Sequence, residues 1–199
     1  MTQETGLTRR GWLAGFLAVA GLGVQGSATT PAEAATDAPV AFMKRLKGPL
    51  VHAARTASSK QFHTLILGHA DISGIALYSL GSYREGLERA SRSRYYRGVA
   101  RYMSRYFALQ AEEYRVTGAE VVGSSWKDGD SYYVDSKVLL EGGSSYSVRW
   151  QLKPAGNSFK VVNVRVLGFW LAYFQRQQFE GFIRKRGGSV NALVAALSP

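Results

Sequence analysis

The sequence predicts an α+β domain, in which helices pack against a curved antiparallel sheet of about four strands. Apolar residues make up 46% of the 199 residues, enough to bury a core. Hydrophobic residues recur at helical spacing up to about residue 114, at a period of two from there to residue 167, and at helical spacing again to the end. Helices grouped around a run of hairpin strands are typical of α+β domains rather than of alternating α/β folds.

The composition excludes several kinds of chemistry. The chain has no Cys, so it has no thiol nucleophile, thiolate metal site or disulfide. Its three His residues leave little for metal binding or acid–base catalysis. With 25 Lys and Arg against 14 Asp and Glu, the formal net charge is +11. This balance favours an anionic partner, such as lipid headgroups, nucleic acid or an acidic protein.

The N-terminal segment has the residue order of a secretory signal. Arg9 and Arg10 precede a short apolar run, residues 12–24, and small residues follow as far as an Ala-x-Ala sequence that ends at Ala34. The apolar run is shorter than the roughly 20 residues of a membrane-spanning helix. The paired arginines indicate a Tat-like signal, with a Sec signal or an uncleaved anchor as alternatives. We place the cleavage after Ala34, with Ala28 as the second choice.

The remaining chain is expected to be one exported domain. Removing residues 1–34 leaves the formal net charge at +11, because the leader carries two Arg and two Glu. Residues 35–39, which are Ala, Thr, Asp and Pro, are expected to form a flexible lead-in. Residues 40–199 have the length of a single domain.

Helices are predicted in the first part of this domain. Residues 40–57 carry apolar side chains at helical spacing, and Pro49 can bend or divide that helix. Residues 62–80 are also apolar, but Gly68 and Gly74 interrupt them, so short helices are expected there.

Residues 92–114 form the strongest predicted helix, which has two side-chain stripes. One stripe is apolar and mostly aromatic, and the other carries Arg94, Arg97, Arg101 and Arg105. Arginines interleaved with aromatic residues can follow a nucleic-acid backbone. Because the two stripes lie on different faces, we interpret the arginines as a solvated surface that meets anionic headgroups or an acidic partner, and we expect no nucleic-acid binding.

Four strands and two closing helices follow. Alternation of apolar and polar residues predicts strands over residues 116–122, 132–140, 146–152 and 159–167. The short connections between them are rich in Gly, Asp, Asn and Pro, which favours hairpins and hence an antiparallel meander. The helical period returns over residues 171–186 and 190–197.

No catalytic signature is present in the sequence. Residues 35–199, which follow the predicted export signal, have no GxSxG, P-loop, GxGxxG or HExxH motif. His63 and His69 are six residues apart, which does not suit a pair of metal ligands on one helix. Asp71 could orient His69 as a base, but we expect Asp71 to cap a helix instead. Asp135 is expected to face away from its apolar neighbours. We therefore expect that the protein is not an enzyme and that it binds no metal and no other cofactor.

The chain resembles the toluene-tolerance, or MlaC, family. Members end a strand at a Gly, followed by Arg-x-Gln-Phe, a Gly-rich turn and a short Leu-rich helix. The matching positions here are Gly168, Arg176, Gln178, Phe179, Gly187, Gly188, Leu193 and Leu197. Upstream, the family's Asp…Ala-x-x-x-Leu-Gly stretch is matched by Asp71, Ala76, Leu80 and Gly81. The resemblance covers roughly residues 40–197. Trp170 and Gln175 depart from the usual Ser and Tyr.

The resemblance implies an NTF2-like cone, whose bent sheet and helices enclose an apolar cavity for lipid tails. It implies a soluble periplasmic phospholipid carrier between an inner-membrane ABC-type lipid transporter and an outer-membrane lipoprotein complex, with transient membrane contact. Moving two tails of roughly 16 carbons from water into an apolar site is favourable by about 25 kcal/mol, at about 0.8 kcal/mol per CH₂. The alternatives are a hopanoid or other apolar ligand, or a cavity enzyme on the same fold.

Candidate site residues lie on the apolar sheet face and the helices expected to face it. The lipid-cavity candidates are Leu77, Leu80, Met103, Phe107, Val138, Leu140, Val148, Trp150, Val164 and Val166, with Trp170 as a lid at the mouth. Arg165 and Arg176 are candidates for contact with a headgroup phosphate or an acidic partner. For any single apolar candidate the ordinary core is the favoured expectation, since the same strand faces and helix stripes build both the core and the cavity wall.

The leader generates a first prediction. We expect the precursor to be exported and cleaved after Ala34, because a charged segment, a short apolar run and an Ala-x-Ala sequence follow one another in that order. N-terminal sequencing of the periplasmic protein measures this directly. Recovery of a membrane-embedded protein that still begins near Met1 would contradict it.

Overall fold

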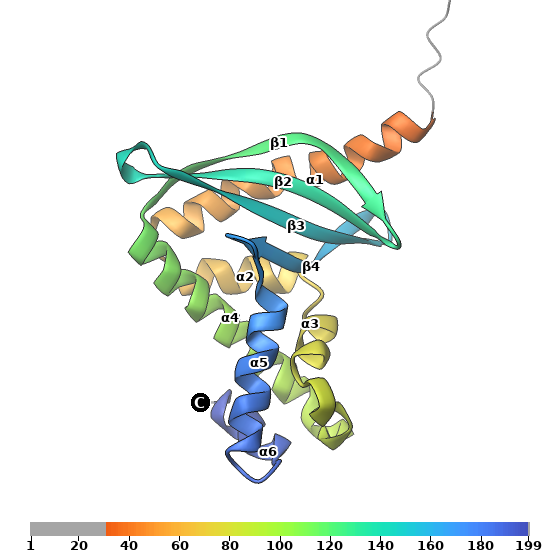
Figure 1. Ribbon diagram of the computed structural model, residues 1–199, viewed down its shortest axis with the longest axis vertical. Helices are drawn as coiled ribbons and strands as arrows, with labels where there is room; N and C mark the ends of the chain where they lie inside the picture. The colour runs from red at the N-terminus through yellow and green to blue at the C-terminus, as the bar shows by residue number, and fades with distance from the viewer. Residues whose placement is uncertain (1–30, 199) are drawn as a thin grey trace, which may run out of the picture.

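The structure is a computed structural model that describes residues 31–198 (Figure 1). Most of the predicted export signal, residues 1–30, lies outside the described residues. The elements follow in the order α1 (Pro31–Arg55), α2 (Ser59–His69), α3 (Ile72–Ser79), η1 (Gly81–Gly86), η2 (Arg89–Ser91), α4 (Arg92–Tyr114), β1 (Val116–Asp128), β2 (Ser131–Leu140), η3 (Glu141–Gly143), β3 (Ser145–Ala155), β4 (Ser158–Val166), β5 (Phe169–Trp170), α5 (Leu171–Arg184) and α6 (Val190–Ala196).

The sheet is an antiparallel meander with the strand order β1-β2-β3-β4-β5. The predicted α+β class and the hairpin connections are confirmed. The sheet has five strands rather than about four, because the chain turns back at Leu167 and Gly168 and Phe169 then pairs with Val166. β5 is only two residues long, and its turn begins with a leucine rather than with the Asn, Asp or Gly that indicate a hairpin in a sequence.

Three irregularities in the strand pairing bend the sheet. The register of β1 against β2 shifts between Val116 and Gly118 and between Val122 and Trp126, and the register of β3 against β4 shifts at Gln151 and Leu152. A bulge of this kind adds a residue to one strand and increases the local bend and twist. The sheet therefore curves around its inner face, which the helices cover (Figure 1).

The helices begin and end mostly where the sequence predicted, with two differences. α1 begins at Pro31, so it includes residues 35–39, for which the sequence indicated a lead-in. The break between α2 and α3 falls at Ala70 and Asp71, not at the glycines, because Gly68 and Gly74 both lie inside helices. Asp71 caps α3, as expected: its Oδ1 accepts a hydrogen bond from the Gly74 amide at 2.9 Å.

Buried apolar side chains form three clusters. The first joins α3, α4, α5 and α6 at the end of the molecule away from the sheet, and it includes the fully buried Tyr95, Leu80 and Ile183. The second joins α1 to the inner face of the sheet. The third lies among α1, α2 and α4. The domain is thus packed at both ends, and the space between the clusters is where a cavity can persist.

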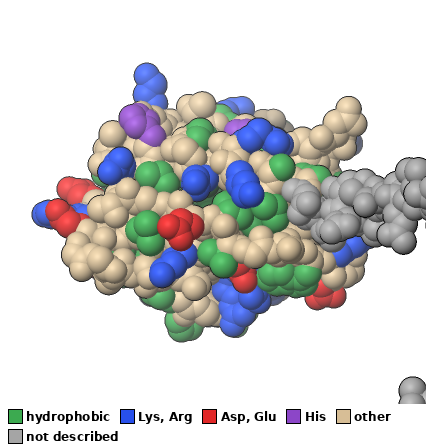
Figure 2. All heavy atoms as spheres, turned by 90° about the horizontal axis from the view of Figure 1, so that it is seen from above, with side chains coloured by type: hydrophobic (Ala, Val, Ile, Leu, Met, Phe, Trp, Pro, Cys, Tyr) green, Lys and Arg blue, Asp and Glu red, His purple; other side chains and the backbone are tan. Residues whose placement is uncertain are grey.

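The charges lie on the outside. Seen from above, blue Lys and Arg side chains predominate over red Asp and Glu side chains (Figure 2). Within residues 38–198 four ion pairs form, between Arg115 and Glu141, Arg149 and Asp135, Lys153 and Asp130, and Arg176 and Glu180. Exposed pairs of this kind contribute about 0–1 kcal/mol each. Most of the basic side chains are therefore left without an acidic partner.

The described residues hold neither a membrane-spanning helix nor a cluster of metal-binding side chains. Among residues 31–198, no helix combines the length and the apolar character needed to cross a membrane. The same part of the chain holds no group of three or more His, Asp or Glu side chains placed to bind a metal ion.

The contact between α4 and the end of α6 generates a second prediction. A Cβ on Gly98 would lie 2.8 Å from the Leu197 Cβ and 2.9 Å from the Leu197 carbonyl oxygen. Gly98→Ala should therefore lower the free energy of unfolding by about 1–2 kcal/mol, because the overlap outweighs the helix propensity that Ala gains. Gly68→Ala in α2 is the matched control: no atom lies within 4 Å of its Cβ, so a gain of about 0.5–1 kcal/mol is expected. Urea denaturation measures both, and a Gly98→Ala variant as stable as the wild type would contradict the close contact.

Candidate functional site

A cavity of about 270 Å³ lies between the inner face of the sheet and the helices. Its lining comes from α1, α2, α3, α4, α5 and the strands β1 to β4, so it is enclosed by segments far apart in the sequence. The volume is close to the lower end of the range for small-molecule sites, about 300–1,000 Å³. Most of the wall is apolar, which suits a water-avoiding ligand.

The sheet side of the wall is built from cross-strand rows of small and branched apolar residues. Val148 on β3 pairs with Ser136 on β2 and with Val166 on β4, and all three line the cavity. Val164 pairs with Trp150 in the next row and also lines the cavity. Because side chains alternate along a strand, these rows share one face of the sheet.

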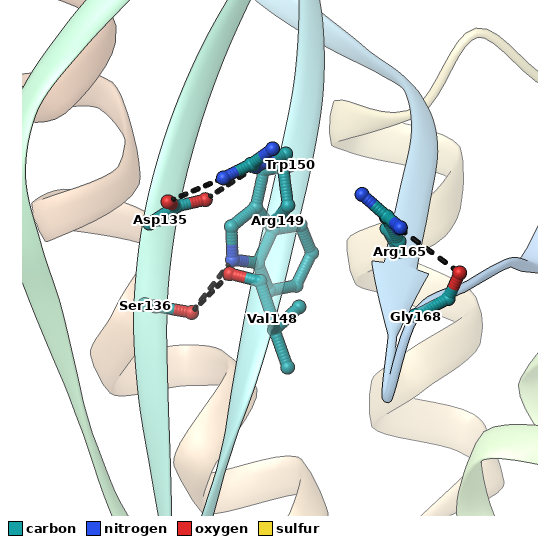
Figure 3. A network of polar contacts seen from close by, with 7 residues as sticks. All are labelled: Asp135, Ser136, Val148, Arg149, Trp150, Arg165 and Gly168. Atoms are coloured by element: carbon teal, nitrogen blue, oxygen red, sulfur yellow. Dashed lines mark hydrogen bonds and ion pairs between the residues drawn. The ribbon is translucent and has the colours of Figure 1, made fainter.

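Trp150 is held by a hydrogen bond at its ring nitrogen and presents the rest of its ring as an apolar surface. Its indole Nε1 donates a hydrogen bond to the Ser136 hydroxyl at 2.8 Å (Figure 3). The Ser136 hydroxyl lies 3.5 Å from the Val148 carbonyl oxygen, to which it donates. The ring nitrogen is thereby satisfied within the sheet, and the rest of the ring is available to the cavity and to the core cluster against α1.

The helix side of the wall comes mainly from α1, α2 and α4. α1 contributes Leu46, Leu50 and Val51, and α2 contributes Phe62, Leu65, Ile66 and His69. α4 contributes Met103, Tyr106, Phe107, Gln110, Ala111 and Tyr114, which follow one another at helical spacing. The same stripe of α4 that the sequence predicts to be buried therefore borders the cavity along its second half.

Two amide side chains in the wall are occupied by hydrogen bonds within the protein. Asn163 Oδ1 accepts hydrogen bonds from the amides of Val164 and Ala172, which holds the start of α5 against β4. Gln175 Nε2 donates to the Ser79 hydroxyl at 2.7 Å. Among the described lining residues there is no Asp or Glu, so a carboxylate base of the kind that cavity enzymes use does not face this space.

The wall carries little charge at neutral pH. Burial lowers the pKa of His69 below its usual 6.5, and the charge of the nearby Lys160 lowers it further. Burial also raises the pKa of Tyr106 and of Tyr146, so both phenols stay protonated. Lys47 on α1 is the one charged group among the described lining residues.

The cavity opens at one end of the sheet. Val148 pairs with Val166, so Tyr146 and Leu167 lie together at the same end of the β3–β4 pair. Tyr146 contacts Tyr114 edge to face, with 6.3 Å between the ring centroids. Tyr114 and Leu167 line the cavity and yet are 41% and 62% exposed. The mouth therefore lies between the end of α4 and the connection from β4 to α5.

The structure places most of the sequence-predicted apolar residues in the cavity wall. The candidates that line it are Met103, Phe107, Val138, Val148, Trp150, Val164 and Val166. They come from α4 and from the inner face of β2, β3 and β4, which the period-two pattern had marked as buried. Whether these residues hold lipid stays a prediction.

Four candidates lie outside the wall. Leu80 is fully buried in the helical cluster of α3 to α6, and Leu77 packs against that cluster, because α3 turns Ile75 rather than these leucines toward the cavity. Leu140 lies at the last position of β2, beyond the part of the strand that borders the cavity. Trp170 does not close the mouth: it lies against Tyr133, 6.3 Å between ring centroids, on the outer face of the sheet.

The two arginine candidates also lie on the outside. The Arg165 Nε donates to the Gly168 carbonyl oxygen at 3.0 Å, and its guanidinium lies 6.0 Å from the centre of the Trp170 ring (Figure 3). The Arg176 Nε lies 3.0 Å from a Glu180 carboxylate oxygen. Asp135 faces away from the cavity, as expected, and accepts two hydrogen bonds from Arg149 at 2.8 and 3.0 Å.

The contribution of α1 and α2 to the wall is not predicted from the sequence. The stripe of α1 from Phe42 to Val51 was recognised as the buried face of a helix, but a periodic stripe does not say what the helix packs against. For His69 the sequence favours a packed or solvated ring over a metal ligand or a base, but it does not indicate a place in the cavity wall. In the structure it lines the cavity and its ring packs edge to face on Phe42, 6.0 Å between centroids.

The family model of the MlaC protein matches residues 40–199 of this chain. The chain belongs to the MlaC family. The match spans the whole domain that carries the cavity, from α1 to α6. No curated protein sequence matches the chain.

The MlaC-family domain is also similar to a solved structure. That structure is a phospholipid-binding protein from Ralstonia solanacearum in complex with a phospholipid. The TM-score is 0.60 at 18% sequence identity, over 81% of this chain and 94% of the other. At this identity the likeness concerns the fold, and it agrees with the NTF2-like arrangement of a curved sheet and enclosing helices.

His69 generates a third prediction. Because its pKa is lowered in the folded domain, the unfolded chain binds more protons just below pH 6.5, so stability should fall as pH drops through that range. His69→Gln removes the titrating ring, and the loss of stability between about pH 7.5 and about pH 5.5 should be smaller in the variant than in the wild type. Thermal melting of both proteins at the two pH values measures the difference. Equal losses would show that His69 is not desolvated at the cavity wall.

Proposed function

We propose that this protein is a non-catalytic periplasmic carrier that binds the acyl tails of a phospholipid in its cavity. The observation that carries the proposal is the cavity itself: an apolar wall, without a carboxylate among its described lining residues, that reaches the surface at Tyr114 and Leu167. A site of this kind can hold and release a water-avoiding ligand, and its described lining offers no carboxylate for general-base catalysis.

Membership of the MlaC family supports phospholipid as the ligand. The similar protein of Ralstonia solanacearum, which has the same fold, is in complex with a phospholipid. The energetics agree, because each CH₂ moved from water into an apolar wall contributes about 0.8 kcal/mol. Tails held by several strands and helices at once can therefore be retained outside a membrane.

We further propose that the carrier moves lipid between an inner-membrane ABC-type transporter and an outer-membrane lipoprotein complex. The predicted Tat-like or Sec leader supports a periplasmic location, and the family supports a shuttle between membranes. Arg165 and Arg176 lie outside the cavity wall, so in this proposal they meet a headgroup or an acidic partner at the surface rather than line the tail site.

A hopanoid or another apolar lipid is the second candidate ligand. The wall is made of Val, Leu, Phe and Trp side chains and holds few polar groups, and such a surface accepts a rigid ring system as well as flexible tails. Mass spectrometry of organic extracts from protein purified from its own compartment distinguishes the two ligands. Near-stoichiometric phospholipid supports the carrier, whereas a hopanoid or an empty cavity contradicts the phospholipid assignment.

Trp150→Asp generates a fourth prediction. A carboxylate in an apolar tail site costs several kcal/mol when it has no partner, so the variant should lose most of its co-purified lipid. Lipid phosphorus per protein measures the loss, and circular dichroism establishes that the variant is folded. A folded variant with a full lipid load would refute the placement of the ligand against Trp150.

The matched control for this change is Trp126→Asp. Trp126 pairs with Tyr133 and stacks on its ring on the outer face of the sheet, 5.4 Å between centroids. The same substitution therefore introduces the same charge on the opposite side of the sheet, and the lipid load should remain at the wild-type level. Equal loss of lipid in both variants would show a general destabilisation rather than a local effect.

A further inference from the structure

A short segment beside the cavity mouth exposes four large apolar side chains. Leu167 is 62% exposed, Phe169 72%, Tyr173 57% and Phe174 49%, and all four lie within the β4–β5 turn, β5 and the first turn of α5. Single exposed apolar residues are ordinary on protein surfaces, but a local group of them marks an interaction site. We call residues 167–174 the apolar tip.

The turn at the start of the apolar tip has backbone dihedral angles that are unusual for its sequence. Leu167 has a φ of 49° and Gly168 a φ of 90°, the left-handed pair that a two-residue hairpin turn requires. Asn or Gly adopts such a φ readily, whereas leucine does so rarely. Arg165 holds the turn through its hydrogen bond to the Gly168 carbonyl (Figure 3). Because a leucine occupies this strained position at a solvent-exposed turn, we infer that its side chain has a role other than stabilising the fold.

The tip is continuous with the cavity. Leu167 both lines the cavity and projects from the mouth, and Leu171, at the start of α5, lines the cavity as well. A tail that leaves the cavity must therefore pass beside the tip. Passing directly into another apolar phase avoids the exposure of its CH₂ groups to water.

Basic side chains outnumber acidic ones around the tip, although Arg149, Lys153 and Arg176 each form an ion pair with a carboxylate. The sequence has no Asp or Glu from Gly142 to Phe179, a stretch that carries Arg149, Lys153, Lys160, Arg165 and Arg176. Arg165 bonds a backbone carbonyl rather than a carboxylate. It lies directly opposite Arg149 in the strand register, and because Asp135 forms an ion pair with Arg149, it is Arg165 that leaves a net positive charge next to the turn.

We propose that the apolar tip inserts into the headgroup layer of an anionic lipid bilayer and brings the cavity mouth against the membrane. Aromatic and aliphatic side chains beside arginines are the composition of segments that bind at a membrane interface. The inference rests on the proposed function, since it gives the tails a path between cavity and bilayer. Among partners, a bilayer fits best because the apolar surface, the positive charge and the exit for tails coincide.

Sedimentation with vesicles tests the proposal. The wild-type protein should bind vesicles of phosphatidylcholine with phosphatidylglycerol, and less well those of phosphatidylcholine alone or at high salt. The double variant Leu167→Asn, Phe169→Ser should lower the partition coefficient about tenfold or more, because two large apolar side chains are lost. Asn suits the φ of position 167, so the variant should fold at least as well as the wild type.

Leu109→Ser is the matched control. Leu109 on α4 is 63% exposed, as much as Leu167, but it does not line the cavity. Its loss should leave vesicle binding unchanged. Wild-type protein that does not bind anionic vesicles, or a tip variant that binds them as the wild type does, overturns the proposal. Binding that requires a membrane protein in the vesicles also overturns it and indicates a protein partner.

A second measurement locates the tip in the bilayer. Phe169→Trp should show a blue shift on vesicle binding and quenching by lipids brominated in the acyl chain, whereas Leu109→Trp should show neither. A tryptophan at position 169 that brominated lipids do not quench overturns insertion. The lipid content of the purified protein separates the two proposals: protein without phospholipid contradicts the carrier function, while the vesicle result still decides the membrane-binding surface.

Discussion

An apolar cavity that stays open inside a folded domain is the constraint on which the rest of this structure depends. Unfilled apolar space costs stability, by roughly 24 cal/mol for each Å³ in core-mutation series. For a cavity of about 270 Å³ this amounts to about 6 kcal/mol, which is comparable to the entire net stability of an ordinary domain. The stabilising contacts therefore have to be found elsewhere, and the clusters on either side of the cavity supply them.

Because of this constraint, some helices form a solid core and others border the cavity. α3, α5 and α6 form with the first half of α4 a compact cluster that includes Tyr95, whose hydroxyl donates to the Ala76 carbonyl at 2.9 Å. The second half of α4, with α1 and α2, borders the cavity instead. One helix thus belongs to a filled core at its start and to an open wall at its end. A ligand in the cavity would add its contacts to the native state alone, so on the proposed function loading stabilises the domain.

The same division explains how far the sequence could predict the site. Alternation along β2, β3 and β4 identifies the inner face, so Val138, Val148 and Val164 could be placed correctly on the cavity side. The stripe on α4 likewise led to Met103 and Phe107. Periodicity marks a face as buried without naming what covers it, so Leu80 in the solid cluster and Leu46 in the wall have the same signature. β5 was missed because its turn begins with a strained leucine.

The two faces of the sheet are kept apart by contacts on neighbouring residues of β3. Arg149 points outward, where Asp135 accepts both of its hydrogen bonds and the Trp126 ring lies 4.5 Å from its guanidinium. Trp150, the next residue, points inward and is tied to Ser136. A slip of one residue between β2 and β3 would turn Arg149 toward the cavity and Trp150 toward solvent, since side chains alternate strictly along a strand. A half-exposed ion pair adds little to stability by itself. The Arg149–Asp135 ion pair instead helps to fix the register between β2 and β3. A shifted register would bury Arg149 and expose Trp150, so it would cost free energy on both faces of the sheet. The apolar cavity wall depends on the observed register.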